Sequence, residues 1–167
     1  MRTAICPGSF DPVTLGHLDI LKRASKIFDK IIVAIPTNPS KRFSFTVEER
    51  IELLTIATKE IGIEIEIESV DGLLADYAKN KNVDVIIKGL RAMTDFEYEF
   101  QMALTNKKLN CELETMFLPT SGENMFMSSS MVKQVALFGG DISHFIPACI
   151  KEKIEERLCS GGFKNGN

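Results

Sequence analysis

The sequence predicts an α/β protein: a single Rossmann-like, doubly wound domain around a five-stranded parallel sheet. Short β-rich runs alternate with longer stretches of helical period, the order expected of βαβ units. Four of the five β-rich runs are apolar at nearly every position, as strands covered by helices on both faces are. The chain has 167 residues, 44% of them hydrophobic, which suits one domain with one core. We place this domain at residues 1–158 and expect residues 159–167 to form a frayed tail.

The expected strands differ in how much of their surface they bury. The third run, residues 63–68, is Ile-Glu-Ile-Glu-Ile-Glu and alternates strictly between apolar and charged residues. Such alternation is typical of a strand with one face in water, so we expect it at an edge of the sheet. The five expected strands are Thr3 to Cys6, Lys30 to Ile35, Ile63 to Glu68, Val83 to Lys88 and Thr115 to Leu118.

Several helices have recognisable first turns. Thr46 with Glu49, and Thr94 with Glu97, have the spacing of a capping box, in which the hydroxyl and the carboxylate each accept an otherwise unpaired N–H. Pro147 suits the first turn of a last helix. The expected helices cover residues 16–28, 47–60, 73–81 and 95–109, the stretch from the serine run to Phe138, and residues 147–158.

The loops after the strands are the expected location of function. Right-handed crossovers in a parallel sheet bring every strand-to-helix loop to the carboxyl edge, where open α/β sheets bind ligands. We therefore expect functional residues in loops 7–16, 36–45, 88–93 and 119–128.

Composition and charge exclude several classes of protein. With 20 Lys and Arg against 23 Asp and Glu, the net charge is −3, which disfavours a nucleic-acid binder. The four cysteines show no C-x-x-C spacing, so neither a zinc site nor a disulfide framework is indicated, and a reduced cytoplasmic setting fits best. The apolar run 31–35 is far shorter than the ~20 residues of a membrane helix. We expect no signal peptide, no membrane partner and no nucleic-acid partner.

Loop 7–16 has the features of a phosphate-binding site. Gly8 and Gly16 allow backbone to approach a ligand, and Ser9 offers a hydroxyl. His17 falls in the first turn of a helix, where free N–H groups and the helix dipole attract anions. The plainer interpretation is a Pro/Gly turn followed by a surface imidazole.

Longer motifs resemble a known family. Thr14-x-Gly16-His17, at the start of the first helix, resembles the T/H-x-G-H signature of the nucleotidyltransferase superfamily. Within this superfamily, the motifs along residues 1–158 are similar in order and spacing to those of the bacterial phosphopantetheine adenylyltransferases. The other matching segments are Pro7-Gly8-Ser9-Phe10-Asp11-Pro12, Pro39-Ser40-Lys41, Phe45-Thr46-x-Glu48-Glu49-Arg50, Lys88-Gly89-Leu90-Arg91-Ala92, Asp95-Phe96-Glu97-Tyr98-Glu99 and Ser128-Ser129-Ser130-x-Val132-Lys133.

This resemblance implies a reaction. Members of the family transfer AMP from ATP to 4′-phosphopantetheine, giving dephospho-coenzyme A and pyrophosphate, directly and in line without a covalent intermediate. A phosphate monoester has a second pKa near ~6, so the nucleophile is already ionised and needs no general base. The resemblance also implies Mg²⁺ bound with ATP, no metal ligands from the protein, and a homohexamer.

The resemblance also assigns roles to individual residues. His17 would stabilise the transition state by donating to the α-phosphate, with Lys41 and Arg91 as the other catalytic residues. The residues implied for ATP are Ser9, Phe10, His17, Gly89, Leu90, Arg91, Glu99, Asn124, Met125, Phe126, Met127, Ser128, Ser129 and Ser130. The residues implied for phosphopantetheine are Ser9, Lys41, Leu74 and Lys88.

Two positions depart from the family pattern. Residue 9 is Ser where many relatives carry Thr, which keeps the hydroxyl. Residue 88 is Lys where Arg is frequent, and lysine lacks the planar fork that binds two phosphate oxygens. We therefore expect affinity or geometry for phosphopantetheine to differ from that of relatives.

Other interpretations of the same residues stay open. Residues 128–130 alone would be a simple helix cap, Lys41 a solvated surface charge and Glu99 a solubilising residue. The loop signature also suits nucleotidyl transfer to nicotinate mononucleotide or glycerol phosphate. A non-catalytic nucleotide sensor is the alternative from another functional class.

Overall fold

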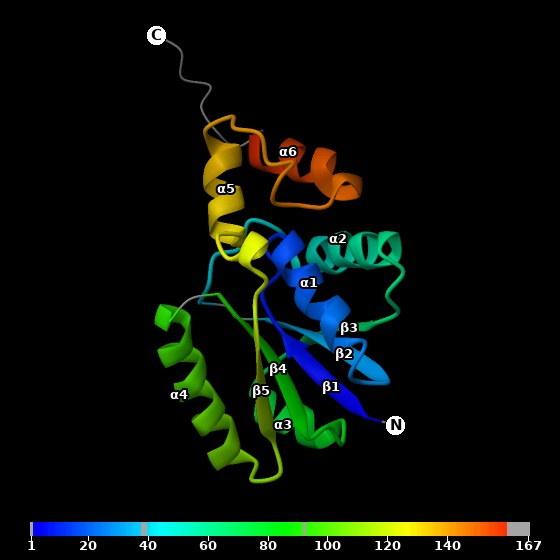
Figure 1. The fold of residues 1–167 in the computed structure, drawn as a ribbon, viewed down its shortest axis with the longest axis vertical. Coiled ribbons are helices and arrows are strands. Elements are labelled where there is room, and N and C mark those ends of the chain that lie inside the picture. The colour runs from blue at the N-terminus through cyan, green and yellow to red at the C-terminus, as the bar shows by residue number, and fades with distance from the viewer. Residues whose placement is uncertain (1, 38–39, 92, 160–167) are drawn as a thin grey trace.

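The computed structural model describes residues 2–37, 40–91 and 93–159 (Figure 1). Five strands form one parallel sheet in the order β3-β2-β1-β4-β5. The predicted fold class is therefore confirmed. The strands are β1 (Thr3–Pro7), β2 (Lys30–Pro36), β3 (Glu66–Val70), β4 (Val85–Leu90) and β5 (Glu114–Pro119).

The described residues also form six α-helices and two 3₁₀ turns: the first four α-helices connect successive strands, and the other elements follow β5. Thr14, Thr46 and Ser128 cap their helices with their hydroxyl oxygens. The elements are α1 (Leu15–Ala24), α2 (Val47–Glu60), α3 (Leu74–Asn80), α4 (Met93–Leu109), η1 (Gly122–Asn124), α5 (Ser129–Leu137), η2 (Ala148–Ile150) and α6 (Lys151–Cys159).

The predicted starts of the third and fourth strands are wrong for one reason. The N–H of Ile63 donates to Thr58, and the N–H of Val83 donates to Ala78, so both residues close the preceding helix. Gly62 and Asn82 turn the chain there with positive φ values of 67° and 52°. Apolar residues that follow a helix can thus belong to its end rather than to the next strand.

Three helices also differ from prediction by more than one residue at a boundary. The first helix ends at Ala24 instead of residue 28, because residues 25–28 form turns whose N–H groups donate back to residues 21–24. α4 begins at Met93, which places Thr94 inside the helix rather than at its cap. The last predicted helix is divided into η2 and α6. Residues 160–167 of the predicted tail and Pro39 lie outside the described residues.

Helices cover both faces of the sheet. Alternate residues of each strand face opposite sides, so Ala4 and Val33 pack with α1, α2, α5 and α6, whereas Ile5 and Ile32 pack with α3. Phe96 of α4 contacts Phe117 of β5, and α4 lies beside β4 and β5 (Figure 1). β3 is at an edge, as its alternating sequence predicted. In the described part of the chain, no helix combines the length and apolarity that crossing a membrane requires.

Candidate active site

A cavity of about 670 Å³ lies at the carboxyl ends of the strands and brings all four predicted loops together. Its wall includes the ends of β1, β2, β3 and β4 and the first turns of α1, α3 and α5. The predicted residues that line it are Ser9, Phe10, His17, Lys41, Leu74, Lys88, Gly89, Arg91, Glu99, Met127, Ser128, Ser129 and Ser130.

Four residues implied for ATP lie outside this wall. Leu90 is the last residue of β4, and its carbonyl accepts from the N–H and hydroxyl of Thr120, directly after β5. Asn124 belongs to η1 and donates to the Ser121 hydroxyl at 2.7 Å, while Met125 and Phe126 expose their side chains to solvent. Their predicted contacts with ATP remain predictions.

His17 is locked to the start of its own helix. The backbone N–H of Thr14 donates to His17 Nδ1 at 3.0 Å, and the N–H of His17 donates to Thr14 Oγ1 at 3.3 Å. This is a capping box in which the imidazole takes the place of the usual carboxylate. Because Nδ1 accepts a backbone N–H, the neutral ring carries its proton on Nε2.

The surroundings of His17 keep the imidazole uncharged. Desolvation, with a smaller effect of the Arg91 charge, lowers the pKa of His17 from 6.5 to about 4. The Phe10 ring meets the imidazole edge-on, with ring centroids 4.9 Å apart. At neutral pH the side chain is therefore a fixed N–H donor and not a cation.

Two cationic side chains reach the cavity from separate loops. Lys41 Nζ donates to the Ser9 hydroxyl at 3.3 Å, which connects the second loop to the first. Arg91 Nη1 donates to the carbonyl of Met127 at 3.4 Å, which connects the fourth strand to the segment before α5. The interpretation of Lys41 as a purely solvated charge therefore does not account for its contact with Ser9.

Lys88 and Glu99 form an ion pair inside the cavity. Lys88 Nζ lies 3.0 Å from Glu99 Oε2, and both side chains are only about one-fifth exposed, at 22% and 21%. The interpretation of Glu99 as merely solubilising is thus wrong, since α4 brings it against the end of β4. A phosphate that binds Lys88 has to compete with the Glu99 carboxylate for the same ammonium group.

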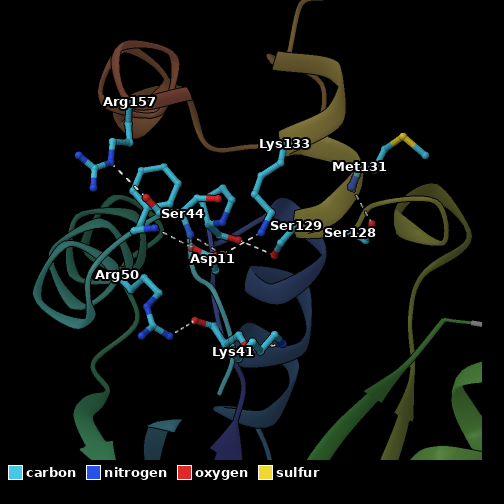
Figure 2. Close-up of polar contacts among 12 residues, drawn as sticks. Asp11, Lys41, Ser44, Arg50, Ser128, Ser129, Met131, Lys133 and Arg157 are labelled. Carbon is cyan, nitrogen blue, oxygen red and sulfur yellow. Dashed lines mark hydrogen bonds and ion pairs between the residues drawn. The ribbon is translucent and has the colours of Figure 1, made fainter. Parts of the chain in front are cut away.

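Two helix amino termini face the same space. The cavity is lined by Gly16 and His17 of α1 and by residues 128–130, the cap and first residues of α5. The Ser128 hydroxyl accepts from the N–H of Met131 at 3.1 Å (Figure 2). The positive ends of both helix dipoles therefore favour an anion there. Cys6 also lines the cavity, but burial raises the pKa of its thiol to about 12, so it is not a thiolate nucleophile.

Sequence reasoning missed the residues behind the first loop. Asp11, Arg50 and Lys133 all occur in the motifs quoted above, yet no role was predicted for them. In the structure Asp11 and Arg50 are buried, and Lys133 forms an ion pair with Asp11. A carboxylate between Phe10 and Pro12 in a Pro/Gly-rich motif is a sequence signal that could have drawn attention to Asp11, whereas the roles of Arg50 and Lys133 have no such signal.

Comparison with known proteins identifies the family of this site. Residues 5–135 match the family described as cytidylyltransferase-like. A phosphopantetheine adenylyltransferase of Caldanaerobacter subterraneus subsp. tengcongensis is 56% identical over 158 residues, covering 95% of this chain and 98% of that protein. The chain belongs to the phosphopantetheine adenylyltransferases of the cytidylyltransferase-like family. Another member, from Clostridium tetani, is 54% identical over 159 residues, covering 95% of this chain and 96% of that protein.

A solved structure extends the likeness of the fold. Nicotinic acid mononucleotide adenylyltransferase of Plasmodium falciparum, complexed with NaAD, matches with a TM-score of 0.73 over 98% of this chain and 99% of that chain. Its sequence identity is 16%, so the likeness concerns the fold alone. The family match and the two relatives in sequence confirm the resemblance that the motifs indicated.

Proposed function

We propose that this protein transfers AMP from ATP to 4′-phosphopantetheine, giving dephospho-coenzyme A and pyrophosphate. The observation that carries the proposal is the convergence of His17, Lys41, Lys88 and Arg91 on one cavity. Relatives that are 56% and 54% identical are named phosphopantetheine adenylyltransferases, which supports this acceptor over nicotinate mononucleotide or glycerol phosphate.

The chemistry needs positioned charge rather than a base. The phosphate monoester of the acceptor is already ionised at neutral pH, because its second pKa is about 6. One of its oxygens attacks the α-phosphorus of ATP, the bond to the bridging oxygen breaks, and pyrophosphate leaves in line without a covalent intermediate. Charge that develops on the α-phosphate and on the leaving group then has to be stabilised.

The cavity supplies this stabilisation with little reorganisation. His17 presents an Nε2–H whose orientation is fixed by the cap at Thr14. Lys41 and Lys88 bind the acceptor phosphate, Leu74 contacts the pantetheine arm, and Arg91 with the start of α5 binds the triphosphate. The nucleotide also contacts Ser9, Phe10, Gly89, Glu99 and residues 127–130.

We further propose Mg²⁺ as a companion of ATP. Among the described residues, no three or more His, Cys, Asp or Glu side chains cluster as metal ligands. The donor set therefore fits a cation held by triphosphate oxygens and water, which would screen the negative charge of the nucleotide.

Assembly as a homohexamer in the cytoplasm completes the proposal. α4 exposes large apolar side chains, Tyr98, Phe100 and Leu104 among them, as a subunit contact requires. All four cysteines are free thiols, as expected in a reducing compartment.

Pyrophosphate release tests the reaction. The protein is incubated with ATP and Mg²⁺, together with phosphopantetheine, nicotinate mononucleotide, glycerol phosphate or no acceptor. Release with phosphopantetheine alone, with dephospho-coenzyme A identified by mass, is the expected result. Release only with another acceptor refutes the proposed substrate, and release with none favours a nucleotide sensor.

A further inference from the structure

Asp11 is a buried carboxylate that connects three segments distant in sequence. It is 3% exposed, and its Oδ1 accepts from the backbone N–H of Ser44 at 3.1 Å and of Phe45 at 2.9 Å. Lys133 of α5 donates to its Oδ2 at 2.8 Å (Figure 2). The loop after β1, the segment before α2 and the helix α5 therefore meet at one side chain.

Further contacts hold the same loop from both sides. Arg50 of α2, which is 1% exposed, donates from Nη1 to the carbonyl of Ser9 at 2.9 Å. The hydroxyl of Ser129 donates to the carbonyl of Pro12 at 2.7 Å (Figure 2). Between these anchors Phe10 has a φ of 47°, a left-handed conformation that costs a non-glycine residue about 1 kcal/mol or more and needs support from its surroundings.

The segments joined by Asp11 carry groups that line the cavity. Ser9 is two residues before Asp11, Lys41 is three residues before Ser44, and the serine run precedes Lys133 on α5. Asp11 and Lys133 themselves are not part of the cavity wall. We therefore expect them to act on a bound substrate through the segments that they hold.

Stability alone is a poor explanation for such a pair. Removing two charges from water costs about as much as their attraction returns, so apolar residues of similar volume often serve a core as well. What the pair adds is a defined geometry, because the carboxylate accepts from two backbone N–H groups and one ammonium at the same time.

We propose that Asp11, neutralised by Lys133, is a positioning residue that sets the alignment of Ser9, Lys41 and the start of α5 around the reacting phosphates. The inference rests on the proposed adenylyl transfer. Misplacement of catalytic groups by about 1 Å can cost on the order of 10²-fold in rate. Losing the pair should therefore reduce kcat more than it weakens the binding of either substrate.

Three variants test the proposal. Lys133→Met removes the charge and keeps most of the length of the side chain, Lys133→Arg keeps the charge, and Asp11→Asn keeps the shape of the carboxylate. The matched control is Lys30→Met, which breaks an exposed ion pair with Glu66 at the amino end of β2, the opposite end of the sheet from this loop. For each variant, kcat, both KM values and the thermal midpoint are measured by pyrophosphate release and melting.

The expected result is a kcat lower by roughly 10- to 100-fold for Lys133→Met and Asp11→Asn, with KM values changed less than about 3-fold. Lys133→Arg should restore most of kcat, and the control should match the wild type. Unchanged kcat in a folded Lys133→Met protein overturns the proposal. So does a kcat that Lys133→Arg fails to rescue, or a Lys133→Met protein that does not fold, since the pair is then structural. A wild-type protein inactive with phosphopantetheine refutes the proposed function instead.

Discussion

Replacing His17 with alanine should separate a large loss of rate from a small loss of stability. The Nε2–H is the donor that we place on the α-phosphate. Deleting one such preorganised donor costs on the order of 10²–10³ in kcat, or about 2.7–4 kcal/mol of transition-state stabilisation. The group is neutral and oriented before substrate binds, so this loss should appear in kcat rather than in KM.

The same substitution also removes a helix cap. The N–H of Thr14, a residue that is only 1% exposed, loses its acceptor on Nδ1. An unsatisfied buried donor or a lost cap costs about 1–2 kcal/mol. For a domain of this size that corresponds to a fall in Tm of roughly 2–8 °C. The protein should therefore remain folded at 25 °C while its turnover collapses.

Glu49→Ala is the matched control. Glu49 accepts from the backbone N–H of Thr46 at 2.7 Å, so it performs at α2 the capping that His17 performs at α1, outside the cavity. It should lower Tm modestly and leave kcat unchanged. Steady-state pyrophosphate release at saturating substrates and thermal melts measure both effects. A His17→Ala enzyme within threefold of wild-type kcat would refute the assigned role.

Three further outcomes are expected. Because the folded-state pKa of His17 is lowered from 6.5 to about 4, unfolding takes up a proton there between these values, and stability should fall as pH drops from 6.5 towards 4. Urea melts should show this slope weakened in His17→Gln, and equal slopes would contradict the shift. Lys41→Ala and Lys88→Ala should weaken phosphopantetheine binding more than ATP binding in calorimetry, whereas equal losses would show the site to be divided differently. At pH 8, iodoacetamide should modify exposed Cys111 and leave Cys6 unmodified by mass spectrometry, because burial raises the Cys6 pKa to about 12; rapid labelling of Cys6 would contradict its burial.

Features that depend on neighbours in sequence were the ones best predicted. The capping box of Thr46 and Glu49 placed the first residue of α2 correctly, because both partners lie within one helical turn. The strict alternation of residues 63–68 placed β3 at an edge, because a face that stays in water is visible in the sequence itself. The strand starts at residues 63 and 83 were predicted wrongly, because apolar residues serve equally well as the end of a helix and as a strand.

The sequence by itself determined the fold class, the edge strand, the loops that hold the site and, through its motifs, the family. Only the tertiary structure decided which charged groups meet. Lys88 and Glu99 come from β4 and α4, and Asp11 and Lys133 are separated by 122 positions. Periodicity and capping depend on residues within one or two helical turns. A carboxylate, in contrast, gains its cationic partner and loses its hydration only when elements distant in sequence pack together. That is why the neutral state of His17 and the anchoring of the first loop required the folded protein.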